Sequence, residues 1–175
     1  MDTTKSHVKV YNITPEMAED FEFDFSTDDQ ELLTELVPNQ SDWGDLSWGI
    51  EFEDYEYNPH DRTMHFGLET KWEPPVDWLV NASKGALYFE NKLITMSTIQ
   101  KDETCVTGVA VMNGELLQNK VIWSMDPADV AKFYDDGHDE YELDDLDNKI
   151  WDSIGQFVTV CEKFYLGGAN EDAGE

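Results

Sequence analysis

The chain has 175 residues and a formal net charge of -28 at pH 7, because 39 Asp and Glu residues outnumber 11 Lys and Arg residues. Hydrophobic residues still make up 40% and aromatic residues 13%, which excludes an acidic disordered chain, since such chains are poor in aromatic side chains. The composition predicts one strongly acidic folded domain with room for one appended element, and disfavours direct binding of nucleic acid.

Strand and helix patterns alternate from the N-terminus. Residues 7–11 alternate apolar and polar side chains and predict a strand. Thr14 and Pro15 predict the beginning of a helix, and a second helix is expected from Ser26 to Pro38. Residues 39–60 place Trp, Phe and Tyr among Asp and Glu, which predicts an irregular or edge segment with aromatic side chains inward and carboxylates outward.

The middle of the chain predicts four more strands and one helix. Residues 63–70 alternate as a strand, and Pro74-Pro75 begins a helix that ends near Gly85. Three further strands are expected at residues 86–98, 104–112 and 115–123. Asn113-Gly114 lies between the last two and predicts a two-residue hairpin, because both residues tolerate positive φ. The sheet is therefore expected to contain antiparallel strands.

The C-terminal part has helical character. A short helix is expected to begin at Asp126-Pro127, and a long amphipathic helix from about Asp139 to Leu166, where Gly167-Gly168 ends it. Its apolar stripe is Leu143, Leu146, Ile150, Ile154, Phe157, Cys161 and Phe164. Acids near a helix N-terminus gain about 0.3–1 kcal/mol each, but like charges at i,i+4 repel by a similar amount. The many carboxylates in its first turns therefore do not serve helix stability.

Three motifs in the middle of the chain carry a family resemblance. They are Leu36-Val37-Pro38, Trp48-Gly49 and Phe66-x-Leu68-x-Thr70-x-Trp72-x-Pro74-Pro75. Over roughly residues 6–124 the chain resembles the YubB-type ferredoxin-like domain of plasmid and phage proteins. The resemblance implies a ferredoxin-like fold and a mobile-element setting, with no catalytic residue set. The chain departs from the family at Ile50-Glu51-Phe52-Glu53 and at Glu73, where both changes add negative charge.

We therefore predict an α+β fold in two parts. Residues 1–124 are expected to form a ferredoxin-like antiparallel sheet with helices on one face. Residues 125–175 are expected to form an acidic helical extension packed on it. No charged segment followed by an apolar one opens the chain, and no run of 18 apolar residues occurs, so we expect a cytoplasmic protein.

No motif indicates catalysis. His7, His60, His65 and His138 lack metal-ligand spacing, and Cys105 and Cys161 are expected to be separate reduced thiols. An EF-hand loop with Gly137 in the sixth position would place Lys132 first and Leu143 last, which is wrong for calcium. Gly-rich phosphate loops and nucleophile elbows do not occur. We predict a protein that is not an enzyme and has no cofactor or metal.

The charge itself suggests a function. Twenty-eight charges equal those on roughly 48 Å of duplex DNA. A compact chain of this length is only about 40 Å across. The first hypothesis is a phage or mobile-element inhibitor that mimics DNA charge and covers the DNA-binding surface of a basic host protein. Such a host protein would be a nuclease, a restriction or CRISPR-type complex, or a nucleoid protein, reached in the host cytoplasm. The expected contact residues are Glu51, Glu53, Asp54, Glu56, Asp135, Asp136, Asp139, Glu140, Glu142, Asp144, Asp145 and Asp147.

The acidity also fits two hypotheses that do not involve mimicry. One is a non-catalytic accessory or regulatory module whose acidity keeps it soluble. It would bind partners through the aromatic side chains of residues 43–57 or the apolar stripe of the last helix. The second is adaptation to high salt, which the abundance of aromatic residues and of Lys over Arg disfavours.

Overall fold

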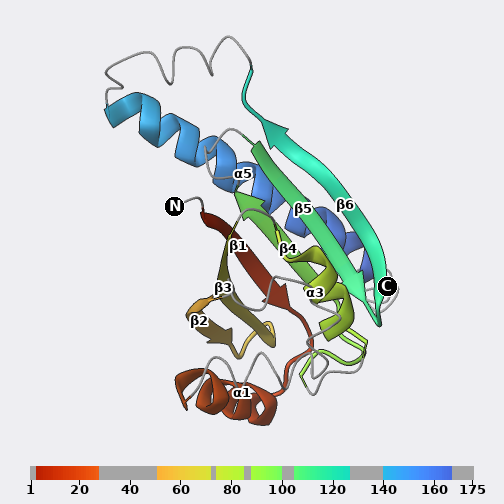
Figure 1. Ribbon diagram of the computed structural model, residues 1–175. Helices are drawn as coiled ribbons and strands as arrows, with labels where there is room; N and C mark the ends of the chain where they lie inside the picture. The colour runs from red at the N-terminus through yellow and green to blue at the C-terminus, as the bar shows by residue number, and fades with distance from the viewer. Residues whose placement is uncertain are drawn as a thin grey trace.

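The computed structural model describes residues 3–27, 51–71, 74–84, 88–99, 105–126 and 140–166. This part of the chain forms an α+β fold, in which one six-stranded antiparallel sheet lies between helices (Figure 1). The strands are β1 (Thr3–Val10), β2 (Glu51–Asn58), β3 (Thr63–Lys71), β4 (Ile94–Ile99), β5 (Cys105–Met112) and β6 (Glu115–Ser124). The helices are α1 (Pro15–Thr27), α3 (Val76–Ala82) and α5 (Glu140–Tyr165).

The strand order is β2-β3-β1-β4-β5-β6, and every neighbouring pair is antiparallel. β1 lies between β3 and β4, so Ser6 is opposite Leu68 on one side and Thr98 on the other. The connection through α1 leads from β1 to β2 past β3, and the connection through α3 leads from β3 to β4 past β1. β2 and β6 are the two edge strands.

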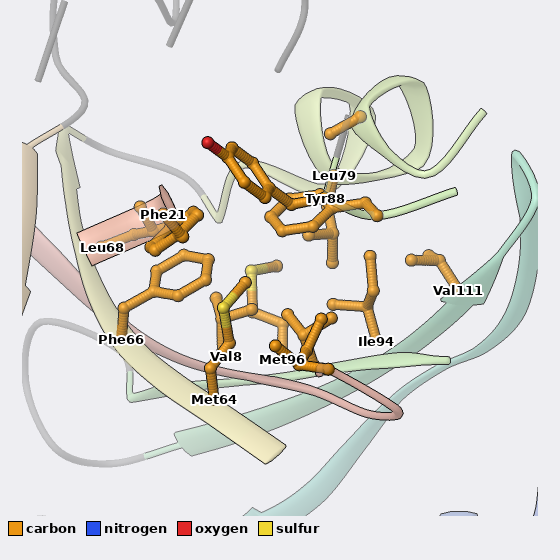
Figure 2. Close-up of a cluster of buried hydrophobic side chains, with 14 of the residues drawn as sticks. Val8, Phe21, Met64, Phe66, Leu68, Leu79, Tyr88, Ile94, Met96 and Val111 are labelled. Atoms are coloured by element: carbon orange, nitrogen blue, oxygen red, sulfur yellow. The ribbon is translucent and has the colours of Figure 1, made fainter. Parts of the chain in front are cut away.

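One face of the sheet packs against α1 and α3. Figure 2 shows the side chains that meet there, among them Phe21 of α1, Phe66 of β3 and Met96 of β4. The Phe21 ring lies 5.5 Å from the Phe66 ring and 5.1 Å from the Tyr88 ring. Burying an aromatic or aliphatic side chain of this size contributes about 1.5–3 kcal/mol. This cluster is therefore the main core of the domain.

The opposite face of the sheet packs against α5, which runs behind the strands in Figure 1. Ile150, Ile154, Phe157 and Cys161 recur at intervals of three and four residues and are buried against β4, β5 and β6. Gly108 of β5 makes the close approach possible, because a Cβ there would lie 2.8 Å from the Phe157 ring. α5 thus requires a glycine beneath its central aromatic side chain.

Most of the predicted elements are confirmed. β3, β5, β6 and α5 begin and end within about two residues of the predicted positions, and α3 ends at Ala82, three residues before Gly85. Asn113 and Gly114 have φ values of 51° and 78°, so the hairpin has the predicted two-residue loop. The predicted helix from Ser26 to Pro38 lies mostly outside the described residues, and the short helix expected from Asp126-Pro127 lies outside them apart from Asp126.

Three expectations are corrected. β4 begins at Ile94 rather than at residue 86, because Tyr88–Asn91 form a turn in which the Lys92 amide donates to the Phe89 carbonyl at 3.1 Å. β1 begins at Thr3 rather than at residue 7. The expected helices on one face are confirmed by α1 and α3, and α5, the expected C-terminal addition, packs on the opposite face. The predicted apolar stripe of the last helix includes Phe164, but this side chain is 77% exposed. The stripe continues at Tyr165 instead, which packs beside Cys161 and accepts a hydrogen bond from the Gln118 amide of β6 at 3.0 Å.

Both edge strands carry β-bulges. In β2 the register shifts between Glu53 and Glu56, and Asp54 has a φ of 54°. In β6 the pairing with β5 passes over Leu117 and Ile122, which pack toward α5. Each bulge places an extra residue in the edge strand and increases the local twist.

The close contact at Gly108 gives a stability prediction. Gly108→Ala should lower the free energy of unfolding by about 1–3 kcal/mol, because the added methyl group collides with the Phe157 ring. Gly155→Ala on the exposed side of α5 is the control, since an added Cβ there meets nothing within 4 Å. It should raise the free energy of unfolding by about 0.5–1 kcal/mol through helix propensity. Urea denaturation measures both, and equal effects of the two substitutions would contradict the packing of α5.

Candidate functional site

The edge strand β2 is fixed by two tyrosine side chains that point toward the core, one bonded to α1 and the other to the segment just before α1. Tyr55 donates its hydroxyl hydrogen to the carbonyl oxygen of Ala18 at 3.0 Å, and Tyr57 donates to that of Ile13 at 2.7 Å. Both rings pack against the core on the α1 side of the sheet. The predicted arrangement of inward aromatic and outward acidic side chains is thus confirmed for the described side chains of β2.

The carboxylates of β2 lie at the edge of the sheet. Asp54 and Glu56 are exposed, and Glu53 is half-buried, since its aliphatic stem crosses over Gly67 of β3. An added Cβ at Gly67 would lie 2.9 Å from the Glu53 Cγ. The backbone of Glu51 is also in β2, but its side chain is outside the described part.

Helix α1 adds a second set of carboxylates beside β2, which sequence reasoning missed. Four of its five acids are exposed to solvent, and the fifth lies one turn after the buried Phe21. They are Glu16, Glu19, Asp20 and Glu22, which are exposed, and Asp24, which is half-buried and accepts a hydrogen bond from the Tyr88 hydroxyl. With five acids in α1 and four in β2, these adjacent elements carry nine carboxylates and no Lys or Arg. The sequence does contain a signal for these acids, because α1 is an amphipathic helix whose charged residues are all acidic.

The negative charge of α1 acts on Tyr55 of β2. Burial, together with the negative charge of Glu22 and the neighbouring Tyr57, raises the pKa of the Tyr55 hydroxyl to about 12. A carboxylate of α1 therefore acts on a side chain of β2. We call the nine carboxylates of these two elements the α1–β2 acidic surface. It continues around the edge of the sheet, because the acids of α1 lie on the α1 side whereas Glu53, which crosses Gly67, lies on the α5 side.

The predicted acidic set at residues 135–147 is only partly described. Asp145 and Asp147 are exposed on the first turns of α5. Asp145 forms an i,i+4 ion pair with Lys149 at 3.3 Å. Glu140, Glu142 and Asp144 belong to α5, but their side chains are outside the described part, and Asp135, Asp136 and Asp139 lie outside the described residues altogether.

His7 of β1 connects the two predicted acidic sets. The Trp151 ring of α5 packs against the His7 ring with the centroids 4.8 Å apart. Burial lowers the pKa of His7, the charge of Asp54 opposes this shift, and Lys5 adds to it. Asp54 of β2 and Trp151 of α5 therefore both act on His7, Asp54 through its charge and Trp151 through ring contact.

A cation of β1 is neutralised by α5. Glu162 accepts a hydrogen bond from the Lys9 ammonium at 2.7 Å and one from the Tyr11 hydroxyl at 2.7 Å. Burial alone would raise the pKa of Glu162, but these two hydrogen bonds and the charges of Lys9 and His65 lower it overall. Burial also lowers the pKa of His65, and Lys9 contributes in the same direction. Lys9 therefore adds little net positive charge to the surface.

The described residues contain no group of three or more His, Cys, Asp or Glu side chains that could hold a metal ion. Cys105 and Cys161 are free, and burial raises the pKa of both thiols. In the part of the chain that the structure covers, no helix is long and apolar enough to cross a membrane.

Comparison with known proteins gives no relative: no protein-family model, no curated protein and no solved structure matches the chain. The resemblance to the YubB-type domain therefore stays an expectation. Function is accordingly inferred from the charges and contacts of the described residues.

The Lys9–Glu162 pair gives a pH prediction. The pKa of Glu162 is lowered from 4.5 in the folded protein, so its ionised form stabilises the fold above about pH 4.5 and this contribution is lost as the pH falls through the folded pKa. Glu162→Gln should lower the free energy of unfolding by about 1 kcal/mol at pH 7, a value reduced for partial exposure. The difference from the wild type should shrink below about pH 4.5.

Asp145→Asn is the matched control, because it removes an exposed ion pair of the same helix. Its effect at pH 7 should stay below about 0.5 kcal/mol. Chemical denaturation over a pH series measures both variants. A Glu162→Gln difference that does not change with pH would show that the ionised carboxylate is not what stabilises the contact.

Proposed function

We propose that the protein mimics the charge of DNA and covers the DNA-binding surface of a basic host protein. The observation that supports this proposal most directly is the α1–β2 acidic surface, where nine carboxylates share two adjacent elements without a cation. The two elements hold nine of the 39 acids of the chain in 21 of its 175 residues, which is about twice the average density of acids. A surface of a single sign focuses its field on an oppositely charged partner.

The spacing of these carboxylates supports the same proposal. Alternate residues of a strand, such as Glu51 and Glu53, are about 6.7 Å apart along the strand. Glu16, Asp20 and Asp24 recur at i,i+4, which is about 6 Å along a helix. A DNA strand carries one charge per 3.4 Å of axis. Each row therefore has about half the charge density of one DNA strand, and the two rows together approach that of a single strand.

The proposed mechanism is occlusion. Carboxylates of the α1–β2 acidic surface, together with Asp145 and Asp147 of α5, pair with Lys and Arg residues that otherwise bind phosphates. Complementary charge speeds the encounter and fixes the orientation of the complex. The same charge repels nucleic acid, so the partner is a protein. The proposed partners are host nucleases, restriction or CRISPR-type complexes, and nucleoid proteins.

We also infer a ferredoxin-like unit within the domain. The order β2-β3-β1-β4, with α1 and α3 on one face, is the arrangement expected for a split β-α-β pair. In this interpretation β5, β6 and α5 are additions to the unit.

The mobile-element setting depends only on the resemblance of the sequence motifs, and the proposed cytoplasmic location follows from that setting.

An accessory protein-binding module is the second proposal. Val160 and Phe164 of α5 are exposed apolar side chains one turn apart, which favours a contact with another protein. The two binding surfaces first expected for such a module, the aromatic side chains of residues 43–57 and the apolar stripe of the last helix, are less favourable. Ile150, Ile154 and Phe157 are buried against the sheet, and Tyr55 packs against the core.

A charge-neutralised variant tests the mimicry. Replacing Glu16, Glu19, Asp20, Glu53, Asp54 and Glu56 by Gln or Asn should reduce competition with duplex DNA for a captured basic protein by at least about tenfold. The melting temperature should stay unchanged or rise, because removing like charges relieves repulsion. The measurement is a competition assay with labelled duplex DNA, accompanied by a melting curve.

A control variant carries five neutralised acids elsewhere, at the exposed positions Asp77, Glu90, Glu115, Asp126 and Asp152. It should retain most of the competition. Equal loss in both variants would mean that net charge matters and the α1–β2 acidic surface does not.

Salt dependence separates the two proposals. The screening length falls from about 30 Å at 0.01 M salt to about 8 Å at 0.15 M. Affinity of the mimic for its basic partner should therefore fall steeply over this range when measured by titration calorimetry. Affinity that stays flat would favour apolar docking at Val160 and Phe164 and the accessory function.

A further inference from the structure

Trp151 projects from the flank of α5 that faces β1. It is 47% exposed, whereas the preceding residue, Ile150, is 1% exposed and lies in the buried stripe. Successive residues of a helix point about 100° apart, so the indole leaves the helix sideways. Its ring meets the His7 ring at an interplanar angle of 62°. Trp151 is therefore held in place on one side by β1 while much of its surface stays accessible.

Trp151 lies one helical turn from an exposed acid on one side and one turn from a glycine on the other. Asp147 lies one turn before it on α5 and is exposed. Asp54 of β2 acts electrostatically on His7, which the indole contacts. One turn after Trp151 is Gly155, where an added Cβ would meet nothing within 4 Å. A planar group can thus approach the exposed part of the indole with no side chain at position 155 in its way and with the Asp147 carboxylate one turn away.

We propose that Trp151 receives an arginine side chain of the basic partner, whose guanidinium stacks on the indole while Asp54 and Asp147 supply the opposing charge. This inference rests on the proposed function, since it names one contact of that interface. Guanidinium is planar and weakly hydrated, so it stacks on aromatic rings better than an ammonium group does. Trp is the best aromatic partner for cations, and Trp and Arg are both enriched among residues that dominate binding energy.

The nearby basic groups do not prevent this contact. Burial and the charge of Lys5 lower the pKa of His7 below 6.5, against the effect of Asp54, so its imidazole is mostly neutral at pH 7. Lys5 is exposed, and solvent and salt screen its charge. Lys149 of α5 is paired with Asp145. A nucleobase in place of the guanidinium would bring a phosphate close to Asp54 and Asp147, which disfavours it.

Labelled oligoarginine and oligolysine peptides of equal length test the proposal. Their affinities for the wild type, Trp151→Leu and Phe164→Leu are measured by fluorescence anisotropy. Trp151→Leu should reduce the ratio of arginine to lysine affinity by about two- to fivefold, which corresponds to one exposed cation–π contact. Phe164→Leu removes an exposed aromatic ring from the same helix and should leave the ratio unchanged.

A second measurement does not depend on the folding of Trp151→Leu. The indole Nε1–H signal of Trp151, assigned by its loss in Trp151→Phe, should shift on addition of oligoarginine to the wild type and much less on addition of oligolysine. An unchanged affinity ratio in folded Trp151→Leu, or equal shifts with both peptides, would overturn the arginine contact. Failure of the charge mimicry has a different signature, since neither peptide would then compete with the captured basic protein.

Discussion

The fold depends on burial of apolar side chains on both faces of one sheet, because only this burial offsets the repulsion among the carboxylates. Exposed like charges one helical turn apart cost about 0.2–0.5 kcal/mol per pair. A single buried Phe or Leu contributes about 1.5–3 kcal/mol. α1 and α3 cover one face around Phe21 and Phe66, and α5 covers the other around Phe157. A sheet covered by helices on one face only would lose the apolar burial around Phe157, but the carboxylates would still repel one another.

The same double coverage determines where charge can accumulate. The buried stripes of α1 and α5 point toward the sheet, so their acidic faces point away from it on opposite sides. β2 ends the sheet between these layers and brings its own carboxylates to the edge. Lys9, a cation of the interior strand β1, is neutralised by Glu162 of α5. The separation of charge is therefore a consequence of the layer arrangement.

Local patterns in the sequence predicted the elements well but not their relation to one another. Asn113-Gly114 determined the hairpin, and the three-and-four spacing of Ile150, Ile154 and Phe157 predicted α5. Such a spacing shows that a helix has a buried face without indicating which face of the sheet receives it. Strand order depends on pairing between distant segments, so β2 could be assigned to an edge but not to a neighbour.

The candidate site was predictable in part for the same reason. The acids of β2 stood out as a dense run, whereas those of α1 are spaced along a helix and become a surface only when that helix packs beside β2. The contact between His7 and Trp151 joins residues 144 positions apart in the chain and has no local signature. Charge alone also cannot name a partner, because it attracts any basic surface.

The bulges in β2 and β6 limit how this protein can meet other molecules. A regular edge strand offers its free amide and carbonyl groups as a template for another strand, which leads to sheet extension and aggregation. In this domain the twist at Asp54 and the extra residues Leu117 and Ile122 interrupt that template at both ends of the sheet. Recognition must then proceed through side chains. A protein present at high concentration in a cell could in this way keep an incomplete sheet without polymerising.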